Sequence, residues 1–460
     1  MKRYVIWLLC AAVLFMLGGC ATSDQDDASV PQPDVPTATP EDGLAVDVGE
    51  HDDLTVTNGG VYTFSGTKTD IGILVNAPKQ DVTLVLNGVT LENHNGPAIF
   101  VKEAGSVTIT LADGTTNTLS DGSSYTFTDS ETNVDAAVFS RADLIVNGNG
   151  TLIVNGNYQH GIVSKDTLSI VSGAMNITSQ GDGIQANDTI TVSGGQVTVT
   201  AGDDGVHADT DLVVSGENTT LTVTQSYEAL EATSVIISGG TLSLNATDDG
   251  INAAGGNDGS AMDGRPGQGM FSASTGSVAI SGGDVYIRAA GDAIDSNGTL
   301  QISGGDIVVS GATRGDTAML DFDTTGEISG GTFVGTGAAG MAQNFSSTSS
   351  QGVMMVSASG QAGTVITLTD ADGNQLLTRT ADQAFSCIIL SHPDLVKGKT
   401  YTVTVGTSST DVEMTATVVG EGNHGMGGMG GGGHRPPNSN RPDGYFPNGT
   451  PQNGIQPRSE

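Results

Sequence analysis

A six-residue motif with an acidic residue at its second position recurs through the middle of the chain. Its five copies span residues 181–186, 203–208, 227–232, 248–253 and 291–296. The acids at the second position are Asp182, Asp204, Glu228, Asp249 and Asp292, and in two copies the first position is also acidic, as Asp203 and Asp248. Carboxylate oxygens are the ligands that hard divalent cations prefer. The motif therefore predicts cation binding if the fold brings its copies together.

The spacing of the motif predicts such a fold. The second-position acids from Asp182 to Asp249 follow one another at intervals of 22, 24 and 21 residues. Between copies the sequence reads as two alternating strands joined at Ser-Gly-Gly, as at residues 193–195. A repeat of about 22 residues with three short strands matches one turn of a parallel β-helix, in which neighbouring turns lie roughly 4.8 Å apart. We therefore predict an all-β solenoid of about ten or eleven turns.

Period-two alternation assigns the side chains that face the interior of each turn. In two successive turns these are Ile184, Ala186, Ile190, Val192, Val197 and Val199, then Val206, Ala208, Leu212, Val214, Leu221 and Val223. The Gly-Gly pairs are placed where the backbone must bend with a positive φ between two strands. A leucine-rich repeat would require a Leu-x-x-Leu-x-Leu pattern with an Asn ladder, and neither occurs.

Composition and charge agree with a narrow core and exclude several partners. The 460 residues include 67 Gly and only 4% aromatic residues, too few large side chains for a wide globular core. A net charge of −35 repels nucleic acid and anionic lipid, so we expect no nucleic-acid partner. We also expect a monomer. The cysteines are Cys10, Cys20 and Cys387, which provide no disulfide framework.

The N-terminus predicts export and lipid anchoring. Lys2 and Arg3 precede an apolar stretch over residues 4–16, and residues 17–20 read Leu-Gly-Gly-Cys. This segment resembles a bacterial lipobox, which implies cleavage before Cys20, acylation of that residue, and an extracellular protein attached to the membrane only through its lipid.

The sequence as a whole predicts five segments. These are a signal peptide (1–19), a Pro- and Asp-rich tether (20–43), a β-helix (44–345), a C-terminal β cap (346–420) and a Gly-, Met- and Pro-rich tail (421–460).

Stacked in register, the second-position acids would form a vertical file, and Asp316 is expected to continue it. Two carboxylates about 4.8 Å apart repel by roughly 3 to 4 kcal/mol at an effective dielectric near 20. No Lys or Arg occurs between Lys165 and Arg265, a span with fourteen Asp and Glu residues. Protonation or bound divalent ions must therefore offset the repulsion, and oxygen ligands in an extracellular setting favour calcium. The alternative is that each Asp forms an Asx turn and binds nothing.

A second file is expected three residues after the first and facing outward. Its members are Gln185, His207, Glu231, Asn252 and Asp295, of which Glu231 and Asp295 add carboxylate ligands. We assign sugar contacts to His207, Tyr227, Asn252 and Arg288. For His207, a spacer that faces solvent is the alternative.

The motifs at residues 248–258 and 291–298, with the Ile-Ser-Gly-Gly strands between and after them, resemble a family of extracellular bacterial carbohydrate-binding β-helix proteins. The resemblance covers roughly residues 44–420. It implies a right-handed parallel β-helix, similar in shape to pectate lyases, that binds calcium and plant cell-wall polysaccharides, including cellulose and acidic pectic sugars. Ala293 stands where the family usually has Gly.

Three functions remain in competition. The first is non-catalytic, calcium-dependent binding of a polysaccharide, with an acidic pectic sugar ahead of cellulose because the only Trp is Trp7 in the signal segment. The second is a polysaccharide lyase in which calcium acidifies the C5 proton of a uronate and Arg288 or Arg314 removes it. The third is a structural stalk or adhesin that calcium stiffens. The insertion at residues 253–276 lies next to the motif at Asp249, and the sequence leaves its role open.

Overall fold

The computed structural model describes residues 43–126, 133–253, 276–312, 315 and 317–420. All the described residues belong to one compact unit, Ala38–Glu460. The predicted signal segment with Cys20, the tail, Arg314, Asp316 and nearly all of the 253–276 insertion therefore lie outside the described residues. None of the described residues forms a helix long and apolar enough to cross a membrane.

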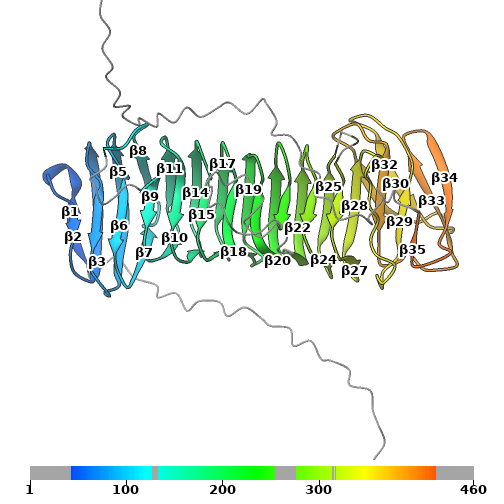
Figure 1. Cartoon of the computed structure of the whole chain (residues 1–460), viewed down its shortest axis with the longest axis horizontal. Helices are drawn as coiled ribbons and strands as arrows, with labels where there is room; N and C mark the ends of the chain where they lie inside the picture. Colours follow the sequence, from blue (N-terminus) through cyan, green and yellow to red (C-terminus); the bar gives the residue numbers. More distant parts are fainter. Residues whose placement is uncertain (1–42, 127–132, 254–275, 313–314, 316, 421–460) are drawn as a thin grey trace, which may run out of the picture. The chain divides into compact units, whose positions relative to one another are not determined.

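The described chain winds through about ten turns of parallel strands that stack in three columns (Figure 1). The column that carries the acidic motif, here called the motif column, positions the candidate site. Its strands are β2 (Thr55–Val56), β4 (Ile73–Asn76), β6 (Ile99–Glu103), β9 (Ala136–Ser140), β12 (His160–Ser164), β15 (Ile184–Ala186), the starts of β18 (Val206–Val214) and β20 (Leu230–Asn245), β21 (Ile251–Ala253), β23 (Ile294–Ser296) and β26 (Leu320–Phe322).

Two further columns complete each turn. The second contains β1 (Leu44–Asp47), the starts of β3 (Gly60–Thr69), β5 (Val82–Asn93) and β22 (Ser277–Arg288), the end of β18 and the middle of β20. It also contains β7 (Ser106–Leu111), β10 (Asp143–Gly148), β13 (Leu168–Ile170), β16 (Thr189–Val192), β24 (Thr299–Ile302) and β27 (Thr325–Ile328). The third contains the ends of β3, β5, β20 and β22 together with β8 (Thr116–Asp121), β11 (Thr151–Gly156), β14 (Ala174–Ser179), β17 (Gln196–Thr200), β19 (Thr220–Gln225), β25 (Asp306–Ser310) and β28 (Thr332–Gly337).

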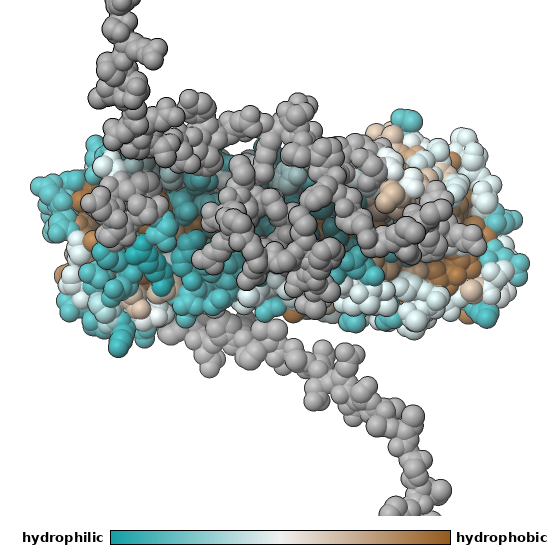
Figure 2. All heavy atoms as spheres, in the orientation of Figure 1, coloured by the Kyte–Doolittle hydropathy of each residue, from teal (hydrophilic) through white to brown (hydrophobic). Residues whose placement is uncertain are grey.

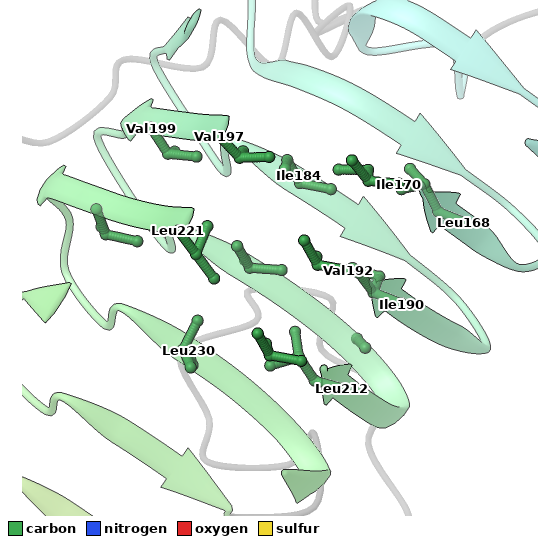
Figure 3. Packing of buried hydrophobic residues seen from close by; sticks show 14 of the residues in the cluster. Leu168, Ile170, Ile184, Ile190, Val192, Val197, Val199, Leu212, Leu221 and Leu230 are labelled. Atoms are coloured by element: carbon green, nitrogen blue, oxygen red, sulfur yellow. The ribbon is translucent and has the colours of Figure 1, made fainter. Parts of the chain in front are cut away.

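Aliphatic side chains from successive turns fill the interior (Figure 3). Ile184 pairs in register with Val206, which pairs with Leu230, and the same column continues through Ile251 and Ile294. All of these residues are fully buried, as are the other positions predicted to face inward. Each turn is stable only because its neighbours cover its apolar edges. The prediction of an all-β parallel β-helix is thus confirmed.

The Ser-Gly-Gly segments make the bend between the second and third columns. The second glycine of each pair has a positive φ, for example 86° at Gly195. The first glycine is constrained by space, since a Cβ on Gly304 would lie 2.2 Å from the carbonyl oxygen of Ser281 in the preceding turn. The predicted positive-φ bend is therefore confirmed, and the close stacking of turns explains why both positions are glycine.

Strands after residue 350 cover the last turn. β32 (Cys387–Ser391) pairs antiparallel with β28 and with β29 (Val353–Val356), and β35 (Val418–Val419) pairs with β29. An antiparallel sheet follows in the order β31 (Gln375–Thr380), β30 (Val365–Thr369), β33 (Thr400–Val405) and β34 (Ser408–Glu413). On the face drawn in Figure 2, apolar surface is visible toward this end. Cys387 is buried here, and its burial raises the pKa of the thiol to about 11.

Candidate functional site

The second-position acids of the motif form the predicted file, and their side chains link successive turns. The backbone N–H of Asp204 donates to Oδ1 of Asp182 over 3.1 Å, and the N–H of Glu228 donates to Oδ1 of Asp204 over 3.2 Å. Two turns further on, the N–H of Asp292 donates to Oδ1 of Asp249 over 2.6 Å. Each such bond uses one carboxylate oxygen, so a cation at this file would be held by the other.

These hydrogen bonds differ from those of an Asx turn, the alternative role considered for the acids. In an Asx turn the side chain accepts from its own chain two residues on. The acceptors here instead receive N–H groups 22 to 43 residues further along the chain, from the next turn of the solenoid. The acids therefore fasten one turn to another, which explains why the acid is retained beside Ala229 and Ala293, where the turn glycine is absent.

The file begins one turn earlier than predicted and ends differently. His160 pairs one strand before the position of Asp182, and its Nδ1 accepts the N–H of Asp182 over 2.9 Å. At the other end, Ile294 pairs with Leu320, which places Ala318 rather than Asp316 after Asp292. The N–H of Ala318 donates to Oδ1 of Asp292 over 2.5 Å. The predicted continuation of the file at Asp316 is thus wrong in register.

The second file is also present in the predicted register. Gln185 pairs with His207, His207 with Glu231, Glu231 with Asn252 and Asn252 with Asp295. One further member, Asp321, was not predicted from the sequence; it lies in β26 and pairs with Asp295. Several members are more buried than an outward position suggests. Glu231 is 1% exposed and Asn252 is 3% exposed.

Toward the N-terminal end of the two files, a histidine lies among three carboxylates. Nδ1 of His207 is 2.5 Å from Oε2 of Glu231 and 3.4 Å from Oδ2 of Asp204, and its Nε2 is 3.2 Å from Oδ1 of Asp209. The side chain of His207 is only 12% exposed, so the alternative of a spacer facing solvent is wrong.

These contacts shift the pKa of each partner. Burial alone would lower the pKa of His207, but its hydrogen bonds to the carboxylates raise it overall. Burial raises the pKa of Asp204, whereas contact with His207 outweighs burial and lowers that of Glu231. Asp182 behaves like Glu231, since His160 lowers its pKa against the effect of burial.

Toward the C-terminal end of the two files, several carboxylates lie close to one another. Asp249, Asp292 and Asp295 each offer an oxygen, and these oxygens lie within 4.8 Å of one another. Burial, followed by Asp292, Asp248 and Asp295, raises the pKa of Asp249 well above its usual range. Burial, followed by Asp321 and then Asp292, raises the pKa of Asp295 to about 7. We call Asp248, Asp249, Asp292, Asp295, Asp321 and Asp323 the carboxylate cluster.

The carboxylate cluster fits a calcium ion. Calcium takes six to eight oxygen ligands at roughly 2.3 to 2.6 Å, so oxygens around one ion lie up to about 5 Å apart. The oxygens of Asp249, Asp292 and Asp295 meet that limit. A divalent cation would also remove the repulsion that raises the pKa values of Asp249 and Asp295.

The four residues assigned to sugar contacts occupy different environments. Asn252 is buried, and its Nδ2 donates to Oε2 of Glu228 over 2.9 Å, while His207 is enclosed as described above. Neither is placed to contact a polysaccharide directly, because neighbouring turns cover both. Tyr227 is half-buried, and its backbone joins Asp203 on one side and Asp248 on the other. Arg288 lies at the end of strand β22 in the third column, where it contacts Asn245 over 3.2 Å and Asp382 over 3.8 Å.

An aromatic group that the sequence analysis did not assemble lies upstream of the acidic files. Phe100 and Phe139 are neighbours in the motif column, with ring centroids 6.0 Å apart. The rings of Tyr125 and Tyr158 stack at 4.5 Å. The hydroxyl of Tyr125 donates to Asp121 over 2.7 Å, and burial raises the pKa of Asp121 to about 6. The register of β6 and β9 was the missing information, since the motif is degenerate in these turns.

Comparison with known proteins adds a family match that covers the turns just described. The model of a family described as carbohydrate-binding domain-containing protein matches residues 50–318. A carbohydrate-binding domain-containing protein from Acetivibrio thermocellus is 40% identical over 97 residues, which are 21% of this chain and 33% of that relative. A solved polysaccharide lyase-like protein from C. thermocellum, a gadolinium derivative, aligns with 27% identity and a TM-score of 0.39 over 63% of this chain and 98% of that one.

Proposed function

Because the chain belongs to the family of carbohydrate-binding domain-containing proteins, we propose that its solenoid binds an acidic polysaccharide through calcium and without catalysis. The chain spans only a third of the length of the curated relative it matches, so the ligand is inferred from the residues of this chain. The observation that carries the proposal is the carboxylate cluster, where the pKa of Asp249 and that of Asp295 are raised by burial and by other carboxylates.

Calcium would supply positive charge at the carboxylate cluster. With a net charge of −35, the protein alone repels a polyuronate. An ion held by Asp249, Asp292 and Asp295 keeps coordination positions for ligands from outside, because calcium takes six to eight oxygens. Carboxylate and hydroxyl oxygens of a uronate are donors of that kind. A neutral glycan offers only hydroxyls, so we expect an acidic, pectic polysaccharide to bind more tightly than cellulose.

Electrophoresis of the full chain through gels that contain a polysaccharide tests this proposal. We expect polygalacturonate to retard the protein in millimolar calcium and to release it when a chelator replaces calcium. Gels with a neutral soluble β-glucan should retard it much less under both conditions. Equal retardation with calcium and with chelator would contradict the proposal. If calcium binds but no polysaccharide retards the protein, the ion serves rigidity alone and the stalk function replaces binding.

Substitution of Arg288 separates binding from lyase chemistry. Arg288 is engaged with Asn245 and Asp382 at the third column, so Arg288→Ala should change polygalacturonate affinity by less than about threefold. Incubation of the wild type with polygalacturonate and calcium should produce no unsaturated uronate absorbance near 235 nm. If Arg288 were the base of a lyase, its loss would cost roughly 100-fold or more in rate. Growth of that absorbance in the wild type and its loss in Arg288→Ala would place the chain among the lyases.

Lipid anchoring outside the cytoplasm is also part of the proposal, and it rests on the sequence around Cys20. Cys20→Ser removes the thiol that would be acylated. We expect the variant protein, expressed in a bacterium, to leave the detergent phase for the aqueous phase in detergent partitioning, and to keep the β-rich circular dichroism of the wild type. A variant that partitions into detergent like the wild type would show that Cys20 is not the anchor.

A further inference from the structure

The cluster around His207 differs in chemistry from the carboxylate cluster. It contains a nitrogen donor, and its two carboxylates, those of Asp204 and Glu231, come from two successive turns. One ligand atom each from Asp204, His207 and Glu231 lies within 4.8 Å of the others. Asp204 is 6% exposed and Glu231 is 1% exposed, so the group is enclosed rather than solvated.

A hydrogen bond on the far side of the ring orients His207. Nε2 lies 3.2 Å from Oδ1 of Asp209, and a carboxylate only accepts, so Nε2 carries a proton. Nδ1 faces Glu231 and Asp204, which also only accept, so a metal ion bound to Nδ1 would take the place of a proton there. A carboxylate bound to the outer nitrogen of an imidazole is the usual support for a histidine that ligates a metal through its inner nitrogen, because it fixes the tautomer and raises ligand basicity.

A buried oxygen at this place makes no hydrogen bond. Oδ1 of Asn252, the member of the second file next to Glu231, is buried without a hydrogen-bond partner, while its Nδ2 is bound to Glu228. Oε2 of Glu231 is buried too, and it lies 2.5 Å from Nδ1 of His207. A buried oxygen without a hydrogen bond is costly, which points to a ligand at this place.

We propose that Asp204, His207 and Glu231 form a second metal site, selective for a zinc-like transition-metal ion and separate from the calcium proposed at the carboxylate cluster. Imidazole nitrogen suits zinc, whereas calcium takes oxygen ligands. Ligand atoms arranged tetrahedrally at about 2.0 to 2.2 Å from zinc lie about 3.4 Å from one another. The separation of Nδ1 from Asp204 already has this value, and the contact with Glu231 needs to open by about 1 Å.

Competition of the full chain against a coloured zinc chelator, in millimolar calcium, tests the second site. We expect the wild type to take up zinc at this site despite the calcium. His207→Gln should lower zinc affinity most, and it keeps a side chain that the same file already accepts at Gln185. Asp209→Ala removes only the outer support and should cost about 10-fold or more. With Co²⁺ as a spectroscopic substitute, the visible absorption of the bound ion should be lost in His207→Gln.

Two controls locate the ion. His94→Gln alters an exposed histidine paired with Asp70 at 2.8 Å and should leave zinc affinity unchanged. Asp295→Asn should weaken calcium binding at the carboxylate cluster but leave zinc affinity unchanged, so failure of one site does not imply failure of the other. If His207→Gln misfolds, Asp209→Ala, at an exposed side chain, decides the question. The proposal is overturned if zinc affinity is the same in the wild type, His207→Gln and Asp209→Ala, or if Asp295→Asn abolishes zinc binding. Nδ1 of His207 would then carry a proton instead of a metal.

Discussion

Replacing Asp249 and Asp292 together by Asn is expected to lower calcium-dependent affinity for polygalacturonate by about 100-fold or more. Each substitution removes one anionic donor from the proposed ion, and calcium affinity depends strongly on the number of charged ligands. The amide oxygen of Asn can still accept the inter-turn N–H that Asp249 and Asp292 now accept. The variant should therefore keep its fold and lose binding, as measured by retardation in polygalacturonate gels.

A matched control separates this local effect from net charge. Asp372→Asn with Glu413→Gln removes the same two charges from exposed positions in the C-terminal sheet region. We expect that variant to retain the affinity of the wild type within about twofold. If both double variants weaken retention equally, the binding depends on overall charge, and the carboxylate cluster is not the site.

The second large effect concerns stability in the absence of calcium. The pKa of Asp295 is raised to about 7 and that of Asp249 is raised well above its usual range. The folded protein therefore binds more protons than the unfolded chain between about pH 4 and 7. These extra protons stabilise the folded protein. This stabilisation is fully present below the pKa that the groups have in the unfolded chain, and it is lost as pH rises through their pKa in the folded protein. We expect the calcium-free protein to melt several degrees lower at pH 8 than at pH 5.

Calcium should remove this dependence, because the ion replaces the protons in offsetting repulsion. Thermal unfolding followed by circular dichroism at pH 5 and pH 8, with chelator and with millimolar calcium, measures both effects. His207 also has a raised pKa and changes stability in the same direction, so the comparison with Asp295→Asn isolates the contribution of the cluster. Identical melting temperatures with and without calcium at pH 8 would contradict a calcium site.

The fold was predictable because one pattern repeats with a nearly constant period. Alternating Val, Ile and Leu residues define the inner face of each strand, and a shift by one residue would expose all of them. The pairing of Ile184 with Val206 and of Val206 with Leu230 follows from this alone. The two acidic files follow in turn, since parallel stacking in register places equivalent residues above one another.

The parts of the site that could not be predicted depend on turns that depart from the repeat. From Asp292 to its neighbour Ala318 the chain runs 26 residues instead of about 22. The prediction chose Asp316 because it is the acid near the expected spacing. The register is instead set by the apolar pair Ile294 and Leu320. The stretch from Gln159 to Val163 resembles a degenerate copy of the motif, but His160 was left out of the predicted file because it is not an acid, although it occupies the adjoining position.

The burial of His207 and Asn252 was unpredictable for a different reason. Alternation assigns a side chain to the outer face of its strand, but it does not tell how far side chains from the adjoining turns cover that face. His207 is enclosed by Asp204 and Glu231, which come from two successive turns. The direction of Arg288 was likewise hidden, because its partner Asp382 lies almost a hundred residues further along the chain.

The most direct test of calcium-dependent polysaccharide binding is the calcium affinity of the full chain, measured by titration calorimetry with and without a saturating oligogalacturonate. If calcium joins the carboxylate cluster to the uronate, each ligand must raise the affinity for the other by the same factor. We predict that the oligogalacturonate tightens calcium binding by about 10-fold or more, and that this coupling is lost in the Asp249→Asn, Asp292→Asn variant. A calcium affinity that the oligogalacturonate leaves unchanged would contradict calcium-dependent polysaccharide binding at this site.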